Sequence, residues 1–268
     1  MTPATRLYVD SPLGPDAILG LDIQRAHYLR SVLRLNRGDA VAVFNGADGE
    51  WRARIDGLGK GWASLAVDAC LRTPTPEPDV WLVFAPIKRA RLDFMVEKAT
   101  ELGAAELVPV YTRHTDVSRV NTGRLSANAR EAAEQCERLS VPPVRAPCEV
   151  SALLHDWPLE RRILLCAESG AAPPIAARLA ELDAAAPVDG VAAARHGPWA
   201  VMVGPEGGFH ASELDALSKL PFVCPVGLGP RVLRADTAAL TALACWQAWM
   251  GDGAARPPGR APETAPSP

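Results

Sequence analysis

The residues best suited to chemistry lie where short apolar runs end in glycine-rich turns. Residues 201–203 lead into Gly204-Pro205-Glu206-Gly207-Gly208-Phe209, and a helical pattern follows over residues 212–220. Glycines at such a turn let backbone amides and carbonyls approach a ligand, because no Cβ stands in the way. The turn is neither the dinucleotide fingerprint nor the phosphate-binding loop. From these residues alone, ligand binding and an ordinary glycine-rich turn are equally supported.

Two further strand ends carry polar groups. Residues 227–234 follow an apolar run, contain Arg231 and Arg234, and precede a helix that Asp236 or Thr237 can cap. Residues 164–170 form the third such end, with Glu168 as its acid. If the three strands are neighbours in a parallel sheet, their loops share one crevice. The arginine pair can equally belong to a solvated loop, and Glu168 alone favours an exposed turn.

A basic run suggests contact with phosphates. Residues 25–37 hold four arginines and His27 but no acid, and on a helix Arg30, Arg34 and Arg37 would share a face. The formal net charge is -3, so any attraction of nucleic acid must come from such a local patch. A merely solvated face is the competing interpretation, and it is favoured on the pattern alone.

A proline-rich segment divides the chain. Residues 73–78 read Thr-Pro-Thr-Pro-Glu-Pro, which no helix or central strand accommodates, so we predict a stiff linker. Residues 1–72 show short alternating runs and glycine turns around one helical segment, which predicts a small β-barrel-like domain. Its expected strands cover residues 6–9, 40–44, 51–55 and 62–67, with the helix near residues 24–35.

The second part, residues 79–250, alternates strand and helix. This alternation predicts an α/β fold with a mostly parallel sheet and helices on both faces. We expect a surface loop at residues 184–198 and a disordered tail at residues 251–268. The expected strands cover residues 81–85, 106–110, 163–167, 199–203 and 222–226.

Composition narrows the setting of the protein. Hydrophobic residues make up 48% of the chain, but no apolar stretch approaches the roughly 20 residues of a membrane span. The N-terminus lacks the apolar segment of a signal peptide. Six scattered cysteines with no CxxC pair predict reduced thiols in the cytoplasm, and no metal site is expected.

Taken together, these segments resemble one family over residues 6 to about 246. The motifs are Arg6-Leu7-Tyr8-Val9, His27 to Arg34, Lys98 to Gly103, Glu131 to Cys136 with Arg138 and Val141-Pro142, Gly204 to Phe209, and Leu228-Gly229 with Val232-Leu233-Arg234 and Thr237-Ala238. Each motif is modest alone, and their order and spacing make the resemblance specific. The family that they resemble is that of the ribosomal RNA small-subunit uridine N3-methyltransferases, within the SPOUT (trefoil-knotted) methyltransferase superfamily.

The resemblance implies a PUA-like β-barrel RNA-binding domain followed by a knotted methyltransferase domain. It also implies S-adenosylmethionine as cofactor, a homodimer, and methylation of N3 of a uridine in the decoding region of 16S ribosomal RNA. Pattern alone would give an unknotted doubly wound sheet, because knots are very rare. Two departures are visible: Asp236 stands where the family usually has Glu, and the 184–198 stretch is longer than usual.

Transferred residue by residue, the resemblance gives a set of site residues. Arg6 and Arg234 are the catalytic candidates, since guanidinium groups could stabilise charge developing on the uracil oxygens. Lys88, Arg113 and Arg138 join Arg30 and Arg34 as expected RNA contacts. The expected cofactor residues are Leu165, Glu168, Val203, Gly204, Pro205, Glu206, Gly207, Gly208, Leu228, Gly229, Val232, Leu233, Arg234 and Thr237.

Two other functions compete with this one. The same scaffold could methylate another position of ribosomal RNA or a transfer RNA, because function belongs to the site rather than the fold. The chain could also be a non-catalytic ribosome-assembly factor that binds RNA through its barrel. The two intact glycine loops argue against the second.

Overall fold

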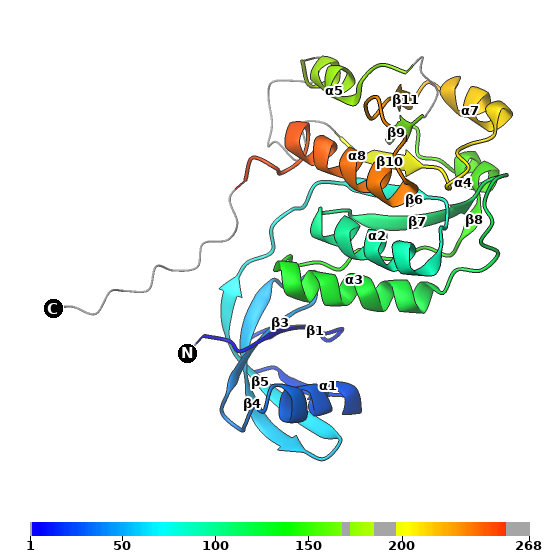
Figure 1. The fold of residues 1–268 in the computed structure, drawn as a ribbon. Coiled ribbons are helices and arrows are strands. Elements are labelled where there is room, and N and C mark those ends of the chain that lie inside the picture. Colours follow the sequence, from blue (N-terminus) through cyan, green and yellow to red (C-terminus); the bar gives the residue numbers. More distant parts are fainter. Residues whose placement is uncertain (1, 168–171, 185–196, 256–268) are drawn as a thin grey trace.

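The computed structural model describes residues 2–167, 172–184 and 197–255, which form two sheets with separate cores. Figure 1 shows the smaller sheet at one end of the molecule and the larger one, flanked by helices, at the other. We call residues 2–72 the N-terminal unit and residues 80–250 the C-terminal unit. Of the loop expected at residues 184–198 and the tail expected at residues 251–268, residues 185–196 and 256–268 lie outside the described residues, as does Glu168.

The N-terminal unit is a five-stranded sheet in the order β1-β3-β4-β5-β2. β1 pairs with β3 in parallel and the other pairs are antiparallel. Register shifts between β4 and β5 mark bulges, which bend a ladder, and every strand contributes to one buried cluster. The elements are β1 (Arg6–Tyr8), β2 (Ile18–Leu21), α1 (Ile23–His27), the π-helical turn η1 (Tyr28–Val32), β3 (Ala40–Phe44), β4 (Glu50–Gly59) and β5 (Trp62–Arg72).

The helix of the basic run is shorter than expected. α1 continues into η1 and ends at Val32, and Arg34 has the left-handed φ of 56°. Arg30 and Arg34 are exposed, whereas Arg37 lies beyond the helix and pairs with Asp56 at 3.2 Å. The prediction that three arginines stack along one helix face is therefore wrong, because the helix ends before the second of them.

The C-terminal unit is a six-stranded sheet in the order β11-β9-β10-β6-β7-β8, and all its pairs are parallel. α2, α3, α5 and α8 contribute to the cluster on one face, and α4 and α7 to the cluster on the other. The prediction of a parallel sheet covered on both faces is confirmed. The elements are β6 (Val80–Phe84), α2 (Arg89–Glu101), β7 (Glu106–Tyr111), α3 (Thr122–Cys136), β8 (Cys148–Glu149), α4 (Val150–His155), β9 (Arg162–Cys166), α5 (Ile175–Ala184), β10 (Trp199–Val203), α7 (Ala211–Ser218), β11 (Val223–Val226) and α8 (Ala235–Trp249).

Hydropathy explains this layering. The strands β9 and β10 are buried along almost their whole length, as strands covered on both faces must be.

No helix in the described part of the chain is long and apolar enough to cross a membrane. The trefoil knot implied by the family resemblance stays a prediction.

Arginines join the two units. Glu50 is buried and accepts hydrogen bonds from Arg6 and Arg72 of the N-terminal unit. Both arginines also donate to backbone carbonyls at the C-terminal end of α3, where helix carbonyls lack partners within the helix. Arg6 donates to the carbonyls of Ala133, Glu134 and Arg138, with nitrogen–oxygen distances of 2.9 to 3.0 Å. Arg72 donates to the carbonyl of Glu137 at 2.8 Å.

We expect the cluster of Glu50, Arg6 and Arg72, called here the joint between the units, to make the free energy of unfolding depend on pH. Burial raises the pKa of Glu50, but hydrogen bonds from Arg72 and Arg6 outweigh it and leave the pKa below its ordinary value of 4.5. Such a carboxylate stabilises the fold above its unfolded pKa, and that stability is lost as the pH falls through the folded pKa. Glu50→Gln should lower the unfolding free energy at pH 7 by about 2 kcal/mol and flatten its decline below pH 4.5.

Denaturant unfolding across pH 3 to pH 7 measures both effects. Asp56→Asn is the control, because Asp56 forms an ion pair with Arg37 in which both side chains are exposed. An unchanged pH profile in Glu50→Gln would contradict the role of this joint.

Candidate cofactor site

A cavity of about 730 Å³ lies at the carboxyl edge of the larger sheet. Its walls come from the segments that follow β9, β10 and β11, which are neighbours in the sheet. Because these strands are parallel, their carboxyl ends meet at one edge, where open α/β sheets bind ligands. The prediction that the three loops share one crevice is confirmed for the described residues.

The wall after β10 is the Gly-Pro-Glu-Gly-Gly turn. The amide of Gly208 donates to the carbonyl of Pro205 at 2.9 Å and closes the turn. Gly208 has a φ of 66°, a conformation that favours glycine. A Cβ at Gly204 would lie 3.1 Å from the ring of Phe209, which also lines the cavity. The glycines therefore permit this turn and the close approach of Phe209.

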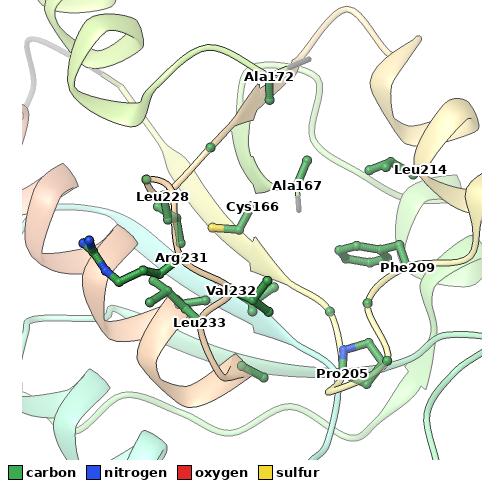
Figure 2. Close-up of a pocket in the computed structure, with 18 of the residues that line it drawn as sticks. Cys166, Ala167, Ala172, Pro205, Phe209, Leu214, Leu228, Arg231, Val232 and Leu233 are labelled. Atoms are coloured by element: carbon green, nitrogen blue, oxygen red, sulfur yellow. The ribbon is translucent and has the colours of Figure 1, made fainter. Parts of the chain in front are cut away.

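The wall after β11 is the Leu228–Leu233 stretch. Gly227 is held at its start, since its amide donates to the carbonyl of Pro173 and its carbonyl accepts from Ile175. Figure 2 shows Leu228, Arg231, Val232 and Leu233 around the cavity. Val232 is 87% exposed although it lines the cavity, so it stands at the mouth. Among the described lining residues, Arg231 is the one with a charged side chain.

The third wall, after β9, is small and apolar. Cys166 and Ala167 lie at the end of the strand, and Ala172 and Pro174 follow. Burial raises the pKa of the Cys166 thiol to about 12, so this thiol is neutral at physiological pH. Figure 2 shows its side chain on the cavity wall. The cavity therefore offers apolar surface and backbone groups rather than charged side chains, as small-molecule sites commonly do.

Most of the expected cofactor residues described by the structure line this cavity, and four do not. Leu165 is fully buried in the sheet, and Glu206, Arg234 and Thr237 are exposed outside the lining. The residues that do line it are Val203, Gly204, Pro205, Gly207, Gly208, Leu228, Gly229, Val232 and Leu233.

Sequence reasoning missed several lining residues. Phe209 directly follows the glycine turn, and Cys166 lies at the end of an expected strand. Both positions could have indicated that these residues line the cavity. Leu214, Ala235 and Ala238 come from α7 and α8, and they reach the cavity because these helices begin at its edge. Helical periodicity alone would have placed them in the core.

The structure places Arg6 away from this cavity. Its three guanidinium nitrogens are bonded within the same chain, to Glu50 and to the end of α3, and its side chain is largely buried. It also lies over the ring of Phe44. Arg6 therefore connects the two units within this chain, and its expected catalytic role stays a prediction. A sequence motif locates such an arginine but does not tell which partners have already engaged it.

Arg138 also has a structural position. Its Nη1 donates to the carbonyls of Thr100 and Ala104 at 2.8 and 3.0 Å, and its Nη2 pairs with Glu77. Its side chain is buried, because α3 ends at Cys136 and the chain then turns inward. The guanidinium is thus already bonded within the chain, and the RNA contact expected of Arg138 stays a prediction. Lys88 and Arg113 are exposed, as are Arg30 and Arg34.

Asp236 is engaged in an ion pair. Arg91 Nη1 approaches both carboxylate oxygens, at 3.0 and 3.4 Å, and the backbone amide of Thr237 donates to one of them. The side chain is buried, so this pair ties the start of α8 to α2. Asp236 therefore anchors the segment beside the cavity. Among the described residues, no group of three His, Cys, Asp or Glu side chains could hold a metal ion.

Comparison with known proteins first gives the class. A family model described as an RNA methyltransferase domain matches residues 74–247, and one described as an RNA methyltransferase PUA domain matches residues 21–65. The two models cover the larger sheet with its cavity and much of the smaller sheet. The molecule is thus an RNA methyltransferase with a PUA domain.

Individual relatives are more specific. Ribosomal RNA small subunit methyltransferase E of Rickettsia conorii is 31% identical over 245 residues, covering 89% of this chain and 93% of the relative. Its counterpart from Synechocystis is 33% identical over 244 residues, covering 90% and 76%. The chain belongs to the ribosomal RNA small subunit methyltransferase E family. The Neisseria gonorrhoeae protein of that name, solved bound to S-adenosyl methionine, has a TM-score of 0.79 and 26% identity, covering 93% of this chain and 99% of its own.

The two neighbouring glycines of the turn should respond differently to substitution. Gly208 has a left-handed φ, so Gly208→Ala should lower the unfolding free energy by about 1 kcal/mol. Gly207 is not left-handed, and a Cβ there would meet His114 at an ordinary 3.5 Å, so Gly207→Ala should be nearly neutral. Urea unfolding of both variants is the measurement. Equal losses in the two would show that the turn has another geometry.

Proposed function

We propose that this protein methylates 16S ribosomal RNA at N3 of a uridine in the decoding region, using S-adenosylmethionine. The observation that carries the proposal is the 730 Å³ cavity, built from three strand ends on the fold of an RNA methyltransferase. Family membership adds support, since its relatives are named as small-subunit ribosomal RNA methyltransferases. The proposed place of action is the cytoplasm, where ribosomal subunits are made.

The cavity suits this cofactor in size and chemistry. Its volume falls in the usual range for small-molecule sites, roughly 300–1,000 Å³. Leu228, Leu233 and Phe209 offer apolar walls, and the glycines of both loops leave backbone groups accessible. The absence of acids among the described lining residues agrees with a ligand bound largely through backbone groups and shape. We assign cofactor binding to the expected residues that line the cavity.

The chemistry requires alignment and control of charge. When bound, S-adenosylmethionine supplies a methyl group already activated on a sulfonium, so the protein mainly has to align donor and acceptor. Uracil N3 becomes nucleophilic as it loses its proton, and negative charge then spreads over O2 and O4. We assign the stabilisation of that charge to Arg234, and its exposure directly after the cavity wall and its lack of an ion pair with a described residue support the assignment.

The proton of N3 has no dedicated acceptor in this proposal. Asp236 is already bonded to Arg91, and its burial removes it from the cavity mouth. Glu206 is exposed on the glycine turn, outside the lining. Water can accept the proton directly, so no side-chain base is required. The neutral Cys166 thiol is a poor nucleophile and does not compete for the methyl group.

The decisive experiment has two parts. Calorimetric titration with S-adenosylmethionine tests whether the cavity binds the cofactor, and a non-catalytic assembly factor would show no binding. Mapping of methylated nucleotides in RNA from cells with and without the gene tests the target. A lost mark on 16S uridine N3 supports the proposal. A lost mark elsewhere in ribosomal or transfer RNA would support the alternative activity on the same scaffold.

Arg234→Lys should slow the reaction more than it weakens binding. Lysine keeps the charge but loses the planar fork that can contact a carbonyl oxygen and its neighbour. Single-turnover methylation should fall by roughly two to three orders of magnitude, as on loss of an oxyanion donor, while RNA affinity changes little. Arg37→Lys, at an exposed ion pair, is the matched control. Weaker RNA binding with a normal rate at saturating RNA would instead assign Arg234 to phosphate contact.

Arg30 and Arg34 should contact phosphates rather than bases. They are exposed in an acid-free run of the N-terminal unit, and no ion pair with a described residue engages them. The double alanine variant should reduce the salt slope of RNA binding by about two units, one for each lost contact. Arg37→Ala should change it less, because Asp56 already pairs with Arg37. A parental slope in the double variant would leave this run a solvated face.

A homodimer is the proposed assembly. Trp246 is buried in the core, whereas Trp249 on the same helix is 45% exposed, and Phe94 on the adjacent α2 is 47% exposed. Such large apolar side chains on neighbouring helices favour a covered face. Sedimentation at micromolar concentration should give twice the chain mass, and Trp249→Asp should shift it toward the monomer. A monomer with full activity would refute the assembly.

A further inference from the structure

A loop that contributes nothing to the cavity lining holds the glycine turn from outside. The segment after β7 places His114 against the turn, with Nδ1 at 3.1 Å from the carbonyl of Gly207 and 3.2 Å from that of Gly208. A Cβ built on Gly207 would lie 3.5 Å from His114 Cβ, so the imidazole packs directly on the turn. His114 does not line the cavity, which lies beside the same two glycines.

The two carbonyl oxygens that His114 contacts determine which ring nitrogen carries a hydrogen. Carbonyl oxygens only accept hydrogen bonds, so Nδ1 must carry a hydrogen and donate to them. The neighbouring His210 has the opposite arrangement, because its Nδ1 accepts from the amide of Ser212 at 3.2 Å at the start of α7. The two rings meet edge to face, with centroids 5.6 Å apart. Each imidazole thus has a defined tautomer at the nitrogen that contacts the backbone.

Glu213 provides a second attachment of the same loop. One carboxylate oxygen accepts from the amide of Arg113 at 3.0 Å, and the other accepts from the amide of His210 at 3.1 Å. α7, which begins at this point, supplies Ala211 and Leu214 to the cavity wall. The loop after β7 therefore fixes both the glycine turn and the first residues of α7.

We propose that His114 is a positioning residue for the cofactor: by donating from Nδ1 to the Gly207 and Gly208 carbonyls, it fixes the turn that forms one cavity wall. The Gly207–Gly208 peptide is thereby held at both polar groups, because its carbonyl accepts from His114 and its amide donates to Pro205. Preorganised backbone groups lower the ordering that a ligand must impose when it binds. The inference rests on the proposed function, since it assigns the ligand of this cavity as S-adenosylmethionine.

Three substitutions separate hydrogen bonding from packing at this position. His114→Asn keeps a donor, because the amide Nδ2 can occupy the place of imidazole Nδ1. His114→Asp has nearly the same shape as Asn but only accepts when ionised, so it repels both carbonyls. His114→Ala removes the group. His155→Ala is the matched control, because His155 is exposed at the end of α4 in the same unit and does not line the cavity.

Calorimetry with S-adenosylmethionine and steady-state methylation of small subunits are measured on the full chain. His114→Ala should raise the cofactor Kd and KM about fivefold, the effect of one net hydrogen bond. His114→Asp should bind at least as weakly as His114→Ala, and His114→Asn should stay within about twofold of the parent. The kcat at saturating cofactor and the KM for subunits should not change. A merely structural role would lower stability and kcat and would not follow the donor order of Asn over Asp.

Glu213→Gln supplies an independent variant. Glutamine retains one acceptor oxygen, so one of the two amide contacts is lost and the cofactor Kd should rise less than in His114→Ala. The double variant should be non-additive, because both residues fix one segment. The positioning role would be overturned if His114→Ala and His114→Asp bound the cofactor as tightly as the parent protein does. The proposed function would still stand in that case, because the parent protein binds the cofactor. No cofactor binding by the parent would overturn the proposed function and this inference with it.

Discussion

Parallel pairing of β11, β9 and β10 is the constraint on which the site depends. It brings the carboxyl ends of three strands to one edge, so segments that are up to about seventy residues apart in sequence wall one cavity. Parallel strands need crossovers, and the helices that cross over cover both faces and make the strands fully buried. The crossover helix α7 and the final helix α8, which follows β11, begin at the cavity and contribute Leu214 and Ala238 to its wall.

A second constraint sets how the arginines are used. The chain has 28 basic and 31 acidic residues, and several arginines serve as internal connectors. Arg6 and Arg72 satisfy the open carbonyls of α3 while Glu50 neutralises them, and Arg138 bonds to carbonyls near α2. These contacts hold the N-terminal unit against α3 in one orientation. An RNA strand held by that unit would thus have a fixed relation to the cavity.

The elements themselves were largely predictable. The apolar runs located β6, β7, β9, β10 and β11, and the helices expected after the two glycine loops are α7 and α8. Several elements were not predicted, among them the helices α4 and α5, the strand β2 and the two-residue β8, and the shortest of these carry no periodic signal. The helix of the basic run was predicted to be too long, because arginines and leucines continue in the sequence beyond Val32. In the structure the helix ends at Val32, and Arg34 has a left-handed φ.

The sequence by itself determined the class of fold, the family and the glycine turns, because these depend on local backbone freedom and on the order of motifs along the chain. It also marked Arg30 and Arg34 as a basic run. Only the tertiary structure decided which groups were already engaged. Arg6, Arg138 and Asp236 have the residue types of a reaction site, but partners 34 to 145 residues away in sequence bond to them. His114 has an unremarkable setting in the sequence, and its contact with Gly207 joins positions 93 residues apart, which no local pattern encodes.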